Sequence, residues 1–150
     1  MTLGANNLDL SSITGDTTAI TYGIPNYPTS EQLSNLTDCV VGVYDKCCSY
    51  FGFQIPVIPS YRSIQLNNYI QGNQLSDKLQ GLVLCMDIAS AGRGVSNYQV
   101  FSYIENTLVF KELIWCYGTT VEPQYVYVSF DYENNIGRVT YKYGRYSPGF

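Results

Sequence analysis

The sequence predicts a single domain of the α+β class, in which helices pack on a small, mainly antiparallel sheet. Over residues 29–51 the apolar residues recur at helical spacing. Residues 79–89 are almost continuously apolar and are bounded by polar residues, which is typical of a buried central strand. The last third of the chain is rich in β-branched and aromatic residues, so strands are expected there. Helices followed by a group of strands indicate an α+β domain.

The composition narrows the function classes. Eight basic and 12 acidic residues give a net charge of −4, and no Lys/Arg cluster is present that would neutralise phosphates, which argues against nucleic-acid binding. No run approaches the roughly 18–20 apolar residues that span a bilayer. The N-terminus MTLGANNLDLSS lacks the basic and apolar regions of a secretory signal. Histidine is absent, which removes the commonest metal ligand and the commonest general base.

The first part of the chain leads into one long helix. Residues 1–28 are expected to form an irregular N-terminal arm, because turn residues and two prolines prevent a continuous helix. Within the arm, 9–14 predicts a short helical turn capped by Ser or Asp. The long helix follows over 29–51, with Thr29 or Ser30 as its cap and a glycine directly after its end.

Residues 54–150 hold the motif region and the C-terminal sheet. Prolines in 54–63 indicate a short or edge strand, and 63–72 predicts a short helix that ends at a glycine. A turn at 91–94 leads to a Ser-capped helix over 96–108. Three strands are expected after it, the last two joined as a hairpin, at 112–118, 124–132 and 138–144.

Cysteine and tyrosine are the two unusual residue types. No two of the five cysteines form a CxxC pair, and without a secretory signal we expect them to be reduced, buried, small apolar residues: Cys39, Cys47, Cys48, Cys85 and Cys116. The 15 tyrosines leave two interpretations open. Tyrosine-rich surfaces make protein or glycan contacts, and strand tyrosines are also common as half-buried parts of a β-rich region.

Four stretches form an ordered set of motifs: 9-DLSSITGDTTAITYGIPNYP-28, 60-SYRSIQLNNYIQG-72, 76-SDKLQGLVLC-85, and 110-FKELIWCYG-118 with 125-YVYVSF-130. The set resembles the zinc D-alanyl-D-alanine carboxypeptidase family, in the small form found in phage endolysins and phage virion proteins. The corresponding family patterns are a GI.N.P segment, a YRS…LN…GG run, S-x-H-x-x-G-x-A-x-D, and LIWE(Y/F)G…WVHVS. The resemblance implies the carboxypeptidase (hedgehog-like) fold over residues 1–150.

The resemblance also implies that the zinc ligands are lost. Family members bind zinc through the His and Asp of the third motif and the His of WVHV, and these positions carry Lys78, Cys85 and Tyr127. The acid of LIWE corresponds to Cys116, and the Trp before the last ligand to Tyr125. A lysine ammonium repels a dication, and a phenol must lose a proton near pKa ~10 to bind one. No metal and no cofactor are therefore expected.

Three further residues complete this vestigial site. Arg62 matches a family arginine that positions the substrate; its interpretations here are retained ligand binding, or anchoring of the adjacent strand and helix by hydrogen bonds. Ser76 opens the third motif, and a local slip would bring Asp87 to the acidic ligand position. Gly72 and Gly81 are interpreted as turn or close-packing residues. An alternative is a recruited metal site made of Cys85, Asp87, Cys116 and Asp77.

The function implied by the resemblance is that of a catalytically inactive, peptidase-like structural protein of the bacteriophage virion, such as a decoration, head-fibre, connector or tail protein. It would be made in the host cytoplasm, and its partners would be other virion proteins or copies of itself, without nucleic acid or membrane. Two alternatives stay open. One is a module that binds cell-wall peptide or glycan through Arg62, Tyr125 and Tyr127, and the other is an atypical peptidoglycan-cleaving metallopeptidase.

Overall fold

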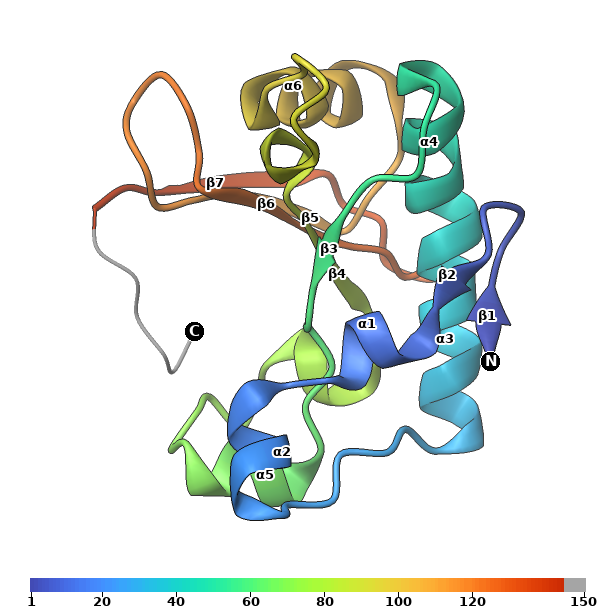
Figure 1. Cartoon of the computed structure of the whole chain (residues 1–150), viewed down its shortest axis with the longest axis vertical. Helices are drawn as coiled ribbons and strands as arrows, with labels where there is room; N and C mark the ends of the chain where they lie inside the picture. The colour runs from blue at the N-terminus through green and yellow to red at the C-terminus, as the bar shows by residue number, and fades with distance from the viewer. Residues whose placement is uncertain (145–150) are drawn as a thin grey trace.

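The computed structural model describes residues 1–144 and confirms the α+β class. Its centre is a five-stranded sheet in the order β3-β4-β6-β5-β7 (Figure 1). Neighbouring strands are antiparallel except for β5 and β7, which are parallel, so the sheet is mainly antiparallel as expected. The strands are β3 (Val57–Ile58), β4 (Val83–Met86), β5 (Glu112–Cys116), β6 (Tyr125–Ser129) and β7 (Arg138–Lys142).

The predicted hairpin of the last two strands is wrong. β7 pairs in parallel with β5, where Ile114 lies opposite Thr140, and it does not pair with β6. Both edges of β6 are already occupied, by β4 on one side and by β5 on the other. The chain therefore crosses from β6 to the free edge of β5. There the Gly137 N–H donates to the Phe110 carbonyl at 2.9 Å and starts the new pairing.

The predicted long helix is confirmed, as three consecutive segments: α3 (Ser30–Cys39), the π-helical turn η1 (Val40–Tyr44) and α4 (Asp45–Phe51). Figure 1 shows them as one continuous rod beside the sheet. Thr29 is the N-cap, and it forms a capping box in which Thr29 and Gln32 each accept a hydrogen bond from the other's backbone N–H. Gly52 ends the helix in the left-handed conformation. The π-helical turn was not predicted.

The π-helical turn places Gly42 against the ring of Phe130. A Cβ at position 42 would lie 2.8 Å from two ring carbons. Gly42→Ala is therefore expected to lower the free energy of unfolding by about 1–3 kcal/mol, measured by urea denaturation. In Gly42→Ala/Phe130→Leu the smaller side chain makes room for the methyl group, so the double variant should lose less than the two single losses combined. Additive losses would contradict this contact.

Side-chain caps define the shorter helices. Asp9, Ser63 and Ser96 each accept a hydrogen bond from a backbone N–H in the first turn of a helix. These helices, all expected from the sequence, are α1 (Leu10–Thr14), α5 (Ile64–Tyr69) and α6 (Asn97–Thr107). The N-terminal arm is more regular than predicted. It also holds α2 (Thr17–Tyr22) and a small sheet of β1 (Thr2–Leu3) and β2 (Leu8–Asp9).

The apolar run at 79–89 forms β4 with a 3-10 helix on each side, η2 (Asp77–Gln80) and η3 (Ile88–Ala91). All four residues of β4 are buried, because both faces of the sheet are covered. Leu84 and Met86 belong to the large core with residues of the long helix and α6. Val83 and Cys85 belong to a smaller buried cluster on the opposite face. Within residues 1–144, no helix combines the length and the apolar character needed to cross a membrane.

Candidate functional site

Strand pairing brings the vestigial-site positions together on one face of the sheet. Cys85 on β4 and Ile114 on β5 are both paired with Tyr127 on β6. Cys116 on β5 is paired with Tyr125 on β6. All five residues belong to the smaller buried cluster. Positions that are distant in the sequence therefore form one site through the strand register.

Lys78 reaches this cluster from η2. Ser76 is the N-cap of η2, and its hydroxyl accepts a hydrogen bond from the Lys78 N–H at 3.2 Å. Gly81 ends η2 in the left-handed conformation. Within this short turn, Lys78 is only 9% exposed, and its Nζ lies 5.9 Å from the centroid of the Tyr127 ring, a cation–π contact. The motif's Ser and Gly thus shape the turn that buries Lys78.

Gly81→Ala is expected to lower the free energy of unfolding by about 2–5 kcal/mol. Gly81 has a φ of +71°, and a Cβ there would lie 2.5 Å from the Gln32 carbonyl oxygen in α3. Gly92→Ala is the matched control, because Gly92 ends η3 with a φ of +65° but a Cβ there meets nothing within 4 Å. The control should lose only about 1–2 kcal/mol. Equal losses in urea denaturation would contradict the role of close packing at Gly81.

Burial controls protonation in this cluster. It raises the pKa values of the Cys85 and Cys116 thiols and of the Tyr127 phenol, because each charged form would lose its hydration. Burial likewise lowers the pKa of Lys78, and the neighbouring Arg62 guanidinium acts in the same direction. At neutral pH the two thiols and the phenol are therefore protonated. Zinc binds deprotonated donors, so these side chains are poorly suited to hold it.

The recruited metal site of Cys85, Asp87, Cys116 and Asp77 is not assembled. The Asp77 carboxylate forms an ion pair with Lys111 at 2.8 Å. At the other end of β4, Asp87 accepts a hydrogen bond from the Asn97 side chain at 2.9 Å, so Asp87 lies outside the cluster. No group of three His, Cys, Asp or Glu side chains within residues 1–144 is placed to hold a metal ion. All five cysteines are buried and free.

Arg62 anchors two segments of the fold. Its side chain is buried, and Nη1 donates to Asn67 Oδ1 at 3.0 Å. Its backbone N–H donates to the Lys78 carbonyl at 3.4 Å. A Cβ at Gly72 would lie 2.5 Å from Arg62 Nη1, so the glycine makes room for the guanidinium. These contacts support the anchoring interpretation. Arg62 connects the segment directly before α5 with the turn after α5 and with η2.

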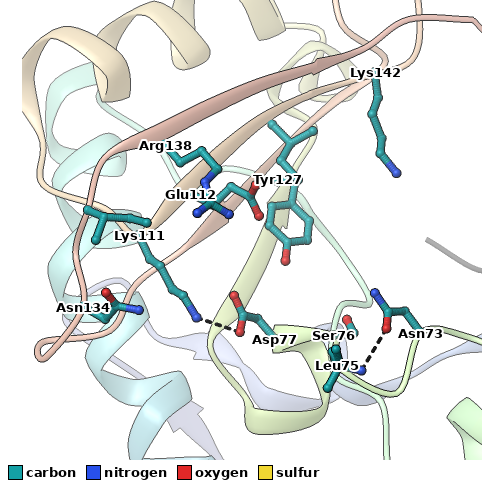
Figure 2. Close-up of a pocket in the computed structure, with 12 residues that line it drawn as sticks. Asn73, Leu75, Ser76, Asp77, Lys111, Glu112, Tyr127, Asn134, Arg138 and Lys142 are labelled. Carbon is teal, nitrogen blue, oxygen red and sulfur yellow. Dashed lines mark hydrogen bonds and ion pairs between the residues drawn. The ribbon is translucent and has the colours of Figure 1, made fainter.

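A cleft of about 550 Å³ opens beside the cluster (Figure 2). Tyr127 and Ser76 line it, and Figure 2 shows the Tyr127 hydroxyl directed towards the loop before η2. Charged side chains of both signs surround the opening: Asp77, Lys111, Glu112, Arg138 and Lys142. The Lys111–Asp77 ion pair crosses one end of the cleft. This arrangement suits the binding of a polar, zwitterionic group.

Three basic residues that line the cleft were not identified from the sequence. Lys111 directly precedes β5, and Arg138 and Lys142 project from β7 on the same face of the sheet. The sequence offered one signal for two of them. Arg138 and Lys142 are four positions apart in a predicted strand, and residues an even number of positions apart lie on the same face of a strand. The position of this basic face beside the vestigial site follows only from the pairing of β7 with β5, which the sequence did not indicate.

Comparison with known proteins yields no matching family model and no matching curated protein sequence. The resemblance to the zinc D-alanyl-D-alanine carboxypeptidases therefore stays a prediction from the motifs. The strand pairing of Cys85 with Tyr127 and the contact of Lys78 with the Tyr127 ring bring these three positions together.

Proposed function

We propose that this chain is a catalytically inactive, peptidase-like structural protein of a bacteriophage particle, which acts through contacts with other particle proteins or with copies of itself. One observation carries the proposal. The three positions that bind zinc in the family that the motifs resemble are adjacent in space, but they present a lysine, a protonated thiol and a protonated phenol.

The donor set does not fit a catalytic zinc ion. Such an ion needs three protein ligands and an open position for water. Lys78 occupies one corner with a residue type that is not among the usual protein ligands of zinc. Burial raises the pKa values of Cys85 and Tyr127 at the other two corners. The family's acid is replaced by Cys116, whose pKa burial also raises. The position of the family's acid therefore supplies no carboxylate to act as a general base.

The exposure of the tyrosines supports a role in protein contacts. Among the tyrosines of residues 1–144, eight are exposed: Tyr22, Tyr27, Tyr50, Tyr69, Tyr98, Tyr132, Tyr141 and Tyr143. Only one of these eight lies within a strand, so half-buried strand positions do not account for them. Tyrosine is enriched at protein interfaces because it buries a large area and keeps a hydroxyl for hydrogen bonding.

Zinc content and cell-wall cleavage test the inactivity. The protein, purified without chelator, should contain substoichiometric zinc by elemental analysis and should release no D-alanine or peptide fragments from purified peptidoglycan. An active zinc carboxypeptidase, run in parallel, verifies the assay. Stoichiometric zinc together with turnover would overturn the proposal and would favour the atypical metallopeptidase.

The cleft favours a second candidate function, the binding of cell-wall peptide without cleavage. Its residues of opposite charge match the charged ends of a short peptide, although the buried Arg62 does not line it. If this function holds, a muropeptide should bind the unaltered chain, and Arg138→Ala should weaken binding. Tyr132→Ala, outside this cleft, is the control. Absence of binding, or equal weakening by both variants, would exclude this candidate.

A further inference from the structure

A groove between α4 and α6 lies outside the vestigial cleft and has the chemistry of a ligand site. These helices pack side by side at one end of the molecule (Figure 1). The groove encloses about 310 Å³, at the lower end of the size of ligand pockets. Its lining, here named the α4–α6 groove, includes Tyr50, Tyr98, Gln99, Ser102, Tyr103 and Asn106.

Two tyrosine rings form a fixed platform in this groove. Tyr50 and Tyr103 are stacked, with ring centroids 4.2 Å apart and an angle of 20° between the planes. Phe51 packs edge-on against Tyr50 at 4.9 Å and supports its orientation. Tyr50 nevertheless remains 64% exposed. A flat, exposed aromatic face of this kind attracts the partially positive C–H groups on one face of a sugar ring.

Two amide side chains are each held at one end and available at the other. Gln99 Oε1 accepts a hydrogen bond from the Ser96 N–H at 2.8 Å, which leaves its Nε2 as a donor. Asn106 Nδ2 donates to the Ser102 carbonyl at 2.9 Å, which leaves its Oδ1 as an acceptor. Neither remaining atom has a hydrogen-bond partner in residues 1–144. The two residues are seven positions apart, so they share one face of α6.

The lining indicates which ligand would fit. No charged side chain from the described part of the chain lines the α4–α6 groove. Aromatic rings with neutral donors and acceptors match the apolar faces and hydroxyl groups of an uncharged sugar. The aromatic surface also continues beyond the groove, since the Tyr98 ring meets Trp115 at 6.0 Å and Trp115 meets the exposed Tyr141 at 5.7 Å. The aromatic surface therefore extends over more rings than a single sugar would contact.

We propose that the α4–α6 groove binds a neutral oligosaccharide. One face of Tyr50 is stacked on Tyr103, and its other face packs against one sugar ring. Gln99 and Asn106 hydrogen-bond to the hydroxyls of the sugar. This site is separate from the vestigial cleft, and the inference does not depend on the catalytic inactivity or the virion role proposed above.

Nuclear magnetic resonance titration of the isotope-labelled full chain tests the proposal. The probes are cellotetraose, maltotetraose and tetra-N-acetylchitotetraose at millimolar concentrations. At least one is expected to shift the backbone amides of 98–106. Tyr50→Ala should weaken that binding about tenfold and Tyr50→Phe should preserve it, because only the aromatic face is needed. Asn106→Ala, at an exposed position, should weaken binding without loss of the fold.

The matched control is Tyr27→Ala, because Tyr27 is 83% exposed and lies outside the groove. It should bind like the unaltered chain. Three results would overturn the proposal: no shift of 98–106 with any of the three sugars, equal weakening by Tyr27→Ala and Tyr50→Ala, or the same shifts on raising the protein concentration without sugar. The last result would assign the groove to a second copy of the chain.

Discussion

A triple variant is expected to bind one equivalent of zinc. It carries the substitutions Lys78→His, Cys85→Asp and Tyr127→His. These substitutions restore the ligands of the family that the motifs resemble. Cys85 and Tyr127 are directly paired across β4 and β6, and the Lys78 Nζ lies 5.9 Å from the Tyr127 ring centroid. Two imidazoles and one carboxylate form a common catalytic zinc set. Elemental analysis and titration with a competing chelator measure the bound metal.

The control for this restoration is Lys78→Met/Cys85→Ser/Tyr127→Phe. It changes the same three positions without introducing zinc ligands, and it should bind no zinc. Circular dichroism and urea denaturation verify that both triple variants are folded. A folded His/Asp/His variant without zinc would show that the three positions do not converge as they do in the zinc carboxypeptidases, and the motif-based relationship would be wrong.

The free energy of unfolding is expected to fall steeply as the pH rises above about 8.5, where thiols of the unfolded chain ionise. Burial raises the pKa of Cys47 to about 12, and it also strongly raises the pKa values of Cys39 and Cys116. Because the folded-state pKa values are raised, their contribution to stability is complete below the unfolded value and is lost as the pH rises towards the folded one. Each such thiol contributes about 1.4 kcal/mol per pH unit in this window.

The thiols of Cys39, Cys47 and Cys116 alone would remove about 6 kcal/mol by pH ~10, which is comparable to the total stability of many domains. Burial also raises the pKa values of Cys48 and Cys85, which act in the same direction. Urea denaturation under reducing conditions at pH ~7, ~8.5 and ~10 measures the loss. Cys116→Ala is the control, because removing this one thiol should reduce the loss between pH ~8.5 and ~10 by about 2 kcal/mol. Stability that stays constant up to pH ~10 would contradict the burial of the thiols.

Elements with local signals were predictable from the sequence. The long helix was predicted from apolar residues at helical spacing, from Thr29 or Ser30 as its cap and from Gly52 after its end. The structure selects Thr29 as the cap and adds the capping box with Gln32. α6 was found in the same way through Ser96. The π-helical turn has no such local signal, because it depends on the packing of Gly42 against Phe130, which is distant in the sequence.

The order of the strands in the sheet could not be predicted from local sequence patterns. A turn between two strand-like segments favours a hairpin. Here β6 lies between β4 and β5, so β7 had no edge of β6 to join. The same error hid the basic side of the cleft, because Arg138 and Lys142 reach it only through the pairing of β7 with β5.

The motifs grouped residues that are far apart in the sequence, and the structure brings most but not all of them together. The motifs identified Lys78, Cys85 and Tyr127, which the strand register and η2 bring together. Asp87 is the exception. The backbone turns from β4 into η3 at this residue, and its carboxylate binds Asn97 instead of joining the cluster.

Quantitative mass spectrometry of purified virus particles whose genome encodes this chain tests the proposed structural role most directly. An inactive structural protein should be present in many copies per particle and should remain bound through density-gradient purification and salt washes. A particle that lacks the chain, while the lysate of infected cells contains it, would contradict the proposed role in the virion.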